Sequence, residues 1–272
     1  MKTTKPQQAP TKPKNLHELL RIVAKAKWRG KSYEMQAYRN VEQFIETVGN
    51  LALEEVKTTT IDDFIDALRG EVADSTINRK LANIHLMLKY GYEREWISRM
   101  PKFEWKEETE GRVRWLTEAE EIEMFGHLES WGEAAVTDFL RILLDTGLRR
   151  GELLKLQAKD VNGDWIRLWV NKTKVARSVP LSVRAKAIIE ERGIPRVTVL
   201  QLTAVWAKLR TAMGLEDDSD FVLHALRHTA ATRTLSKTSN LAIVQKLLGH
   251  RKIQTTMRYA HVSDDDLLSA VR

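Results

Sequence analysis

Residues 165–181 read WIRLWVNKTKVARSVPL and carry the one clear β signal in this chain. Aromatic and β-branched residues fill the first run, NKTK supplies a turn, and Pro180 fits the end of an edge strand. Elsewhere the apolar residues recur at helical spacing. We therefore predict a mainly α fold with a small antiparallel β-sheet, in which Lys172 and Lys174 lie at the tip of a hairpin.

The composition is that of a globular protein with one large domain or two ordinary ones. The chain has 272 residues, of which 43% are hydrophobic and 30% charged. It contains no cysteine, which excludes zinc ribbons, cysteine nucleophiles and disulfide scaffolds and fits a reducing cytoplasm. No apolar run is long enough to span a membrane, and the N-terminus lacks a secretory signal. We expect a cytoplasmic protein without a membrane partner.

The first part of the chain reads as a basic tail followed by helices. Residues 1–14 hold three prolines, four lysines and no acid, which predicts a flexible tail. Residues 15–100 show helical periodicity, and we predict four helices there and no strand. The helix that begins at Ser75 has an apolar stripe formed by Ile77, Leu81, Ile84, Leu88 and Tyr92. Arg79 and Lys80 lie off this stripe.

A second domain begins after a break in the periodicity. Residues 101–115 start with a proline and are rich in charges, which is typical of a linker. Thr117 and Glu120 then fit a capping box at the start of a helix. We predict a second domain over residues 116–272, which contains the hairpin and is therefore α+β.

Residues 221–263 contain seven Lys or Arg and four His but no acid, although the whole chain has 37 acidic residues. A solvated face usually mixes both signs, so this segment indicates a surface that meets phosphate. Within it, His224, Arg227 and His228 share one helical face. The pair of histidines could bind a metal or pack half-buried, but Ala225 stands where a zinc hydrolase has its glutamate base.

Two glycines place further polar residues at helix ends. Gly147 is expected to stop a helix just before Arg149, and a further helix is expected from about Arg149 to Leu156. The Arg149 guanidinium at the start of this helix could clamp a phosphate. Gly249 is expected to stop a later helix just before His250. Tyr259 follows nine residues after His250 in the same basic stretch.

These residues resemble the motifs of the tyrosine recombinase family, the phage-integrase type. The four motifs occur in the family's order and are TGLRRGELLKL (146–156), NKTKVARSVPL (171–181), HALRHTAAT (224–232) and LLGHRKIQTTMRYAHV (247–262). The resemblance implies a helical core-binding domain, residues 15–100, and a catalytic domain, residues 116–272. It implies a catalytic set of Arg149, Lys172, His224, Arg227, His250 and Tyr259, which Glu152 and His228 would orient.

The resemblance also implies a mechanism that needs no metal, ATP or other cofactor. Arg149 and Arg227 would hold the non-bridging phosphate oxygens while Tyr259 attacks phosphorus and forms a 3′-phosphotyrosyl link. His224 is the candidate base. Lys172, with Lys174 as the alternative, would protonate the leaving 5′-oxygen, and His250 would donate a hydrogen bond to the phosphate.

The expected partner is double-stranded DNA at specific recombination sites. The resemblance implies a homotetramer on two sites, and accessory DNA-bending proteins are further candidate partners. It makes the helix from Ser75 a candidate reader of the DNA major groove through Arg79 and Lys80, with a plain surface helix as the alternative. It also implies that a short helix from Ser263 docks on a neighbouring subunit, with packing on its own domain as the alternative. An integrase of a phage or mobile element is the leading interpretation. The alternatives are a chromosome-dimer or element resolvase, a type IB topoisomerase, and a DNA-binding relative without catalysis.

Overall fold

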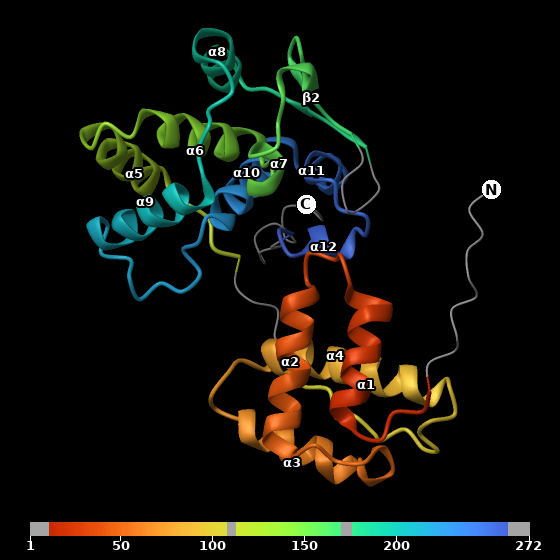
Figure 1. Ribbon diagram of the computed structural model, residues 1–272. Coiled ribbons are helices and arrows are strands. Elements are labelled where there is room, and N and C mark those ends of the chain that lie inside the picture. The colour runs from red at the N-terminus through yellow and green to blue at the C-terminus, as the bar shows by residue number, and fades with distance from the viewer. Residues whose placement is uncertain (1–10, 108–112, 170–175, 261–272) are drawn as a thin grey trace, which may run out of the picture. The chain divides into compact units, whose positions relative to one another are not determined.

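The computed structural model describes residues 11–107, 113–169 and 176–260, and the chain divides into two compact units (Figure 1). The first unit spans residues 1–109 and the second residues 110–272, so the boundary lies inside the segment predicted as a linker. Lys172, Lys174 and the predicted helix from Ser263 lie outside the described residues. Within the described ranges, no helix combines the length and apolarity that crossing a membrane requires.

The described part of the first unit is helical. Asn15 caps the first helix by accepting a hydrogen bond from the backbone N–H of Glu18 at 3.0 Å, as its sequence position predicts. A π-helical turn continues this helix, and a 3₁₀ turn precedes the third. The helices are α1 (Leu16–Val23), α2 (Glu34–Val48), α3 (Thr58–Leu68) and α4 (Asp74–Tyr92).

The core of the first unit forms where α2 packs against α1, α3 and α4. The stripe of α4 that includes Ile77, Leu81 and Ile84 is buried there, as predicted. Tyr92, which we expected in the same stripe, is exposed because the helix ends at this residue. Tyr90 is buried instead and packs against the ring of Trp96.

The second unit combines helices with a three-stranded antiparallel sheet. Its helices are α5 (Glu118–Ser130), α6 (Ala134–Thr146), α7 (Arg150–Leu153), α8 (Val183–Arg192), α9 (Val199–Ala212), α10 (His224–Thr238), α11 (Leu241–Leu248) and α12 (Gln254–Met257). Its strands are β1 (Val161–Asn162), β2 (Trp165–Leu168) and β3 (Arg177–Pro180). The predicted capping box of Thr117 and Glu120 opens α5.

The sheet confirms the predicted hairpin and adds a strand. Strands β2 and β3 pair with Ile166 opposite Val179, and both of these side chains are fully buried. Strand β1 pairs with the other edge of β2, which gives the order β1-β2-β3. The sequence did not predict β1 because two residues are too short to show an alternating pattern.

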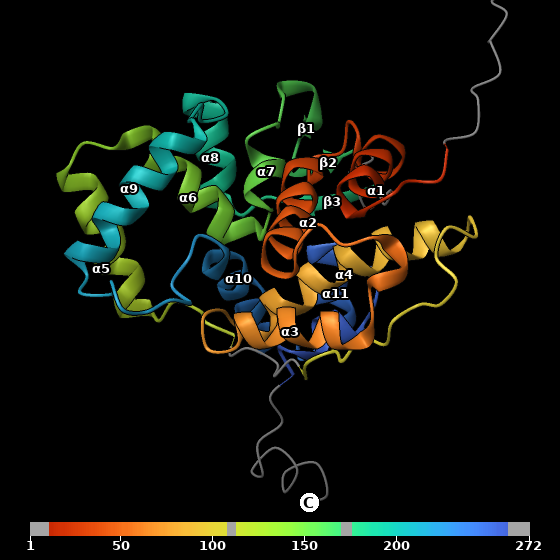
Figure 2. The same cartoon turned by 60° about the horizontal axis from the view of Figure 1, so that its bottom comes forward.

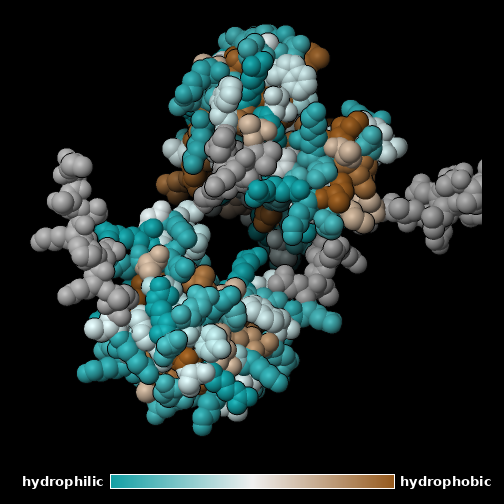
Figure 3. All heavy atoms as spheres, turned by 90° about the vertical axis from the view of Figure 1, so that its right-hand side faces the viewer, coloured by the Kyte–Doolittle hydropathy of each residue, from teal (hydrophilic) through white to brown (hydrophobic). Residues whose placement is uncertain are grey.

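Helix α6 is central to the second unit. It packs against α5, α8, α9 and α10, and Figures 1 and 2 both show α6 beside α8 and α5 beside α9. Apolar side chains also reach the surface of this unit on the face drawn in Figure 3, whereas the first unit is mainly hydrophilic there.

Gly147 ends α6 in a left-handed conformation with φ +63°. A Cβ at this position would lie 3.0 Å from Leu248 and 3.2 Å from Ala230, so the ends of α6 and α11 and the middle of α10 meet here. Glycine is needed both for the backbone angle and for the close approach. This junction brings together three of the four sequence motifs.

Candidate active site

Arg149 stands at the N-cap of α7 and faces a cavity. We predicted a helix from Arg149 to Leu156, but α7 is shorter, and Arg149 has an extended backbone with φ −71° and ψ 143°. Its backbone N–H donates to Glu152 Oε2 at 2.8 Å, and its guanidinium donates to Oε1 at 3.1 Å. Its side chain keeps 36% of its surface exposed. Glu152 therefore holds Arg149 in place.

Arg227, on α10, is almost completely buried and is bound by two backbone carbonyl groups. One guanidinium nitrogen donates to Gly147 O at the end of α6, and the other donates to Leu248 O, at 2.6 Å, at the end of α11. Burial, together with the charges of Arg149 and Arg177, lowers the pKa of Arg227 to about 9. The cluster is therefore short of negative charge, which a phosphate would supply.

Arg149, His224 and Arg227 line one cavity of about 600 Å³. Its other walls come mainly from α9 and from the segment before α10, including Trp206 and Val222. The structure therefore brings together two arginines and a histidine that the sequence predicted as phosphate ligands and base. An anion in this cavity would be held by charge-assisted hydrogen bonds.

Tyr259 is buried and contacts His228. The tyrosine hydroxyl and His228 Nδ1 are 2.8 Å apart, and 5% of the residue surface is exposed. Burial raises the pKa of Tyr259 against the opposing effect of Arg227 and Arg258. In this conformation the phenol is a poor nucleophile unless a neighbour takes its proton.

His228 is that neighbour, although we expected it only to orient other residues. Burial, followed by the charges of His224 and Arg258, lowers the pKa of His228 to about 4. The pKa of His224 is also lowered, first by burial, and its ring lies edge-on to that of His228 with centroids 4.7 Å apart. Both rings are therefore neutral near pH 7 and able to accept a proton. The assignment of His224 as base stays a prediction, with His228 as a second candidate.

His250 directly follows the glycine that ends α11, as predicted. Gly249 has φ +66° and accommodates the left-handed turn. His250 Nδ1 lies 2.9 Å from the hydroxyl of the buried Thr256, and burial, then Arg227, lowers the histidine pKa to about 4. If Thr256 donates to Nδ1, the proton of the neutral ring sits on Nε2, which can donate to an anion.

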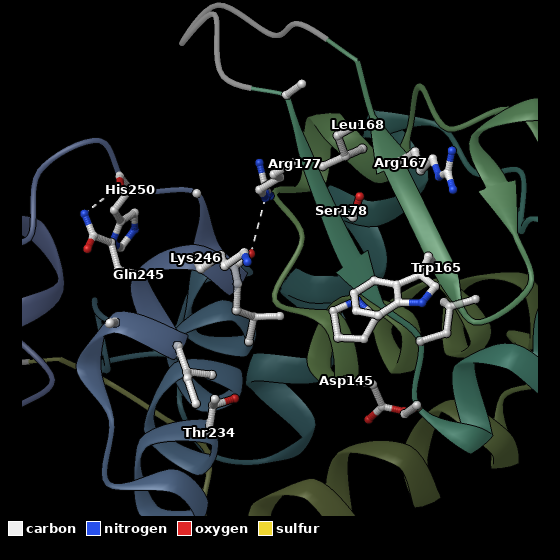
Figure 4. A pocket seen from close by; sticks show the side chains of 18 of the residues that line it. Asp145, Trp165, Arg167, Leu168, Arg177, Ser178, Thr234, Gln245, Lys246 and His250 are labelled. Atoms are coloured by element: carbon white, nitrogen blue, oxygen red, sulfur yellow. Dashed lines mark hydrogen bonds between the residues drawn. The ribbon is translucent and has the colours of Figure 1, made fainter.

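His250 and Arg177 line a second cavity of about 1160 Å³ between the hairpin and α11 (Figure 4). In Figure 4, Arg177 comes from β3 and His250 from the turn after α11. Tyr259 is among the lining residues of neither cavity. The predicted site residues that the structure describes thus come from the start of α7, from α10 and from the segment after α11.

Arg177 is a residue that the sequence analysis missed. Its guanidinium donates to both carboxylate oxygens of Glu152, at 2.8 and 2.6 Å, and its Nε donates to Leu247 O at 3.3 Å. The sequence did contain one signal for it. Arg177 lies two residues before the inward-facing Val179, and residues two apart in a strand face the same side of the sheet. An arginine that points to the core side of a strand needs a buried acidic partner.

The remaining predicted residues are two on α4 in the first unit and the two lysines of residues 170–175. On α4, Arg79 is exposed, whereas Lys80 is half-buried and its ammonium donates to the side chain of Gln43. Lys172 and Lys174 fall in residues 170–175, outside the described part. Among the residues that the structure does describe, no group of three or more histidine or acidic side chains is arranged to hold a metal ion.

Comparison with known proteins identifies the family of this chain. Residues 114–266, more than half of the chain, match the model of the phage integrase family. The chain belongs to the phage integrase family. The matched segment contains all six predicted catalytic positions.

Two relatives and one solved structure illustrate the family. Tyrosine recombinase XerA of Saccharolobus solfataricus is 35% identical over 135 residues, which cover 47% of this chain and 46% of XerA. The integrase of Escherichia phage 186 is 27% identical over 220 residues, 75% of this chain and 64% of that protein. The chain therefore matches about half the length of the first relative and less than two thirds of the second.

The fold of this integrase-family chain is similar to that of a solved relative. The Tn1549 transposon integrase, solved in complex with circular intermediate DNA, gives a TM-score of 0.76 at 19% identity and covers 96% of this chain and 100% of its own. The family's mainly α fold with a small antiparallel sheet, predicted from the sequence, is confirmed.

Proposed function

We propose that this protein is a site-specific DNA recombinase that cleaves and rejoins duplex DNA through a 3′-phosphotyrosyl intermediate. The observation that supports this proposal most directly is that Arg149, Arg227 and the Tyr259–His228 pair lie around the junction at Gly147. A pair of fixed arginines with a tyrosine nearby suits attack on a phosphodiester. These residues come from three of the four motifs, at 146–156, 224–232 and 247–262.

The two arginines supply the electrostatic part of the proposal. Attack on a phosphodiester adds negative charge to the non-bridging oxygens, and fixed cations stabilise that charge without reorganisation. Arg227 is fixed by carbonyl groups at the ends of two helices, and Arg149 by Glu152. Both are therefore preorganised.

Proton transfers complete the proposed reaction. Tyr259 forms the bond to phosphorus while its proton passes to His228 or His224, and the bond to the deoxyribose 5′-oxygen breaks. Lys172, with Lys174 as alternative, protonates that oxygen, and His250 donates a hydrogen bond to the phosphate. Religation reverses these steps with a 5′-hydroxyl from the same or another duplex, so the link conserves the bond energy and no ATP, metal or other cofactor is needed.

The wider role in this proposal is that of an integrase acting in the cytoplasm. A homotetramer would bind two sites on double-stranded DNA, aided by accessory DNA-bending proteins, and Arg79 and Lys80 would contact DNA from the first unit. Relatives named as an integrase and as a Xer recombinase both match this chain, so element or chromosome-dimer resolution is the alternative role.

A nicked DNA substrate tests the proposal. DNA bound by the protein is selected from a library, and a nicked version of the selected duplex is incubated with protein in EDTA. We expect an SDS-resistant adduct with the wild type and none with Tyr259→Phe, which keeps the buried ring but lacks the hydroxyl. Selective binding without an adduct from the wild type would overturn the enzyme assignment and favour a DNA-binding module.

A further inference from the structure

Arg177 joins three segments that carry the candidate site. It begins β3, and it binds Glu152 in α7 and Leu247 O at the end of α11. Its side chain also lies against Gly249, where a Cβ would meet the arginine Cδ at 2.6 Å. Arg177 thus contacts the elements that present Arg149 and His250.

The contact with Glu152 is a buried ion pair. Both side chains have 6% of their surface exposed. Burial raises the pKa of the Glu152 carboxyl, but hydrogen bonds from Arg177 and from the Arg149 backbone outweigh it and bring the pKa to about 2. Glu152 is therefore ionised near neutral pH. Removal of either partner would leave an uncompensated charge in a poorly solvated place.

Glu152 lies between two arginines and does not bind them equally. Arg177 donates to both carboxylate oxygens at 2.8 and 2.6 Å, whereas the guanidinium of Arg149 reaches one of them at 3.1 Å. The bidentate contact is the stronger of the two. Arg149 is also the more exposed arginine and lines the smaller cavity. The carboxylate charge is therefore balanced mainly by Arg177.

We propose that Arg177 is a positioning residue that engages the Glu152 carboxylate and so leaves the positive charge of Arg149 available to the scissile phosphate. The assignment rests on the proposed recombinase function. Without Arg177, Glu152 would draw the Arg149 guanidinium toward itself and cancel part of its charge. The turn that carries His250 would also lose the side chain that packs against Gly249.

A charge-balance experiment separates this role from a structural one. Arg177→Met removes the charge and keeps a side chain of similar length, and Glu152→Gln removes the charge that Arg177 balances. We expect Arg177→Met to slow single-turnover cleavage of the nicked duplex roughly 100-fold, the effect of losing one preorganised cation. The double variant Arg177→Met with Glu152→Gln should recover at least about tenfold of that loss. A purely structural role predicts that the double variant is as slow as the single variant or slower.

Matched variants control for folding and for loss of charge alone. Arg192 pairs with the buried Asp138 at 3.0 Å, although its own side chain is 54% exposed, and it lines none of the cavities described here. Arg192→Met therefore removes an arginine–carboxylate pair away from the site and should leave cleavage within about threefold. Thermal melting by circular dichroism and duplex binding are measured for every variant. If Arg177→Met is unfolded at the assay temperature, Arg177→Lys replaces it, with an expected loss of about tenfold because one ammonium cannot bind both oxygens.

The outcomes distinguish this inference from the function on which it rests. A wild-type protein that forms no adduct overturns both. A wild type that forms the adduct, with Arg177→Met equally fast, overturns the inference alone. The inference alone is also overturned if Arg177→Met is folded and slow but the added Glu152→Gln substitution restores no activity. Where Arg177→Lys has to replace Arg177→Met, cleavage by Arg177→Lys at the wild-type rate overturns the inference alone.

Discussion

Lowering the pH from 7.5 to 5 should destabilise the second unit through its buried histidines. Burial lowers the pKa of both His228 and His250 to about 4, compared with 6.5 for a free imidazole. The unfolded chain therefore binds more protons than the folded one between pH 6.5 and 4. Stability is fully present above pH 6.5 and falls as the pH drops toward 4.

The size of the effect follows from those pKa values. At pH 5 a pKa change from 6.5 to 4 corresponds to roughly 2 kcal/mol per histidine. Both rings are only half-buried and retain some contact with water, so we expect about 1 to 2 kcal/mol for each. Acidic groups with lowered pKa values, such as Glu152 and Glu120, lose their contribution only below about pH 4.5, outside this window.

Urea unfolding followed by circular dichroism at pH 7.5, 6 and 5 measures this dependence. The double variant His228→Gln with His250→Gln keeps neutral polar side chains at both positions and is the matched comparison. We expect the wild type to lose about 2 to 4 kcal/mol more than this variant between pH 7.5 and 5. Equal losses in the two proteins would refute the conclusion that burial lowers the pKa of these two histidines.

Two further substitutions test the junction and the first unit. Gly147→Ala should lower the free energy of unfolding by about 1 to 3 kcal/mol and slow adduct formation, because the residue has a positive φ and its Cβ would press on neighbouring side chains. Gly126→Ala is the control, because a Cβ there would meet nothing within 4 Å. Equal melting temperatures for the two variants would contradict the conclusion that the junction needs glycine at position 147. Arg79→Ala should weaken duplex binding and reduce the slope of affinity against salt by about one, measured by fluorescence anisotropy. Lys80→Ala should have a smaller effect because its ammonium is engaged with a neighbouring side chain, and a larger effect for Lys80 would reverse that assignment.

The sequence predicted those features that depend on local patterns. The hairpin showed as a β-branched run with a turn, and the helix stops at Gly147 and Gly249 showed as glycines after apolar runs. Strand β1 was missed because two residues carry no periodicity. Helix α7 was predicted too long because Leu156 is buried, as Leu153 is, although the helix has already ended at Leu153.

The contacts within the site depend on tertiary packing and could not be predicted in the same way. The helical face shared by His224 and His228 was evident, but which of them meets Tyr259 depends on how α10 lies against the segment after α11. The bidentate pair of Arg177 and Glu152 joins residues 25 positions apart in different elements. The one sequence signal for this pair was that Arg177 lies on the same side of its strand as the inward-facing Val179.

The two carbonyl contacts of Arg227 make this residue a structural cross-link as well as a candidate phosphate ligand. It joins the ends of α6 and α11, and a shorter side chain there would leave two buried carbonyl groups without their partner. A descendant that had lost catalysis and kept only DNA binding would still need this arginine in order to fold. Within such a lineage, the tyrosine is therefore the better marker of retained chemistry, and the arginine reports mainly on the integrity of the fold.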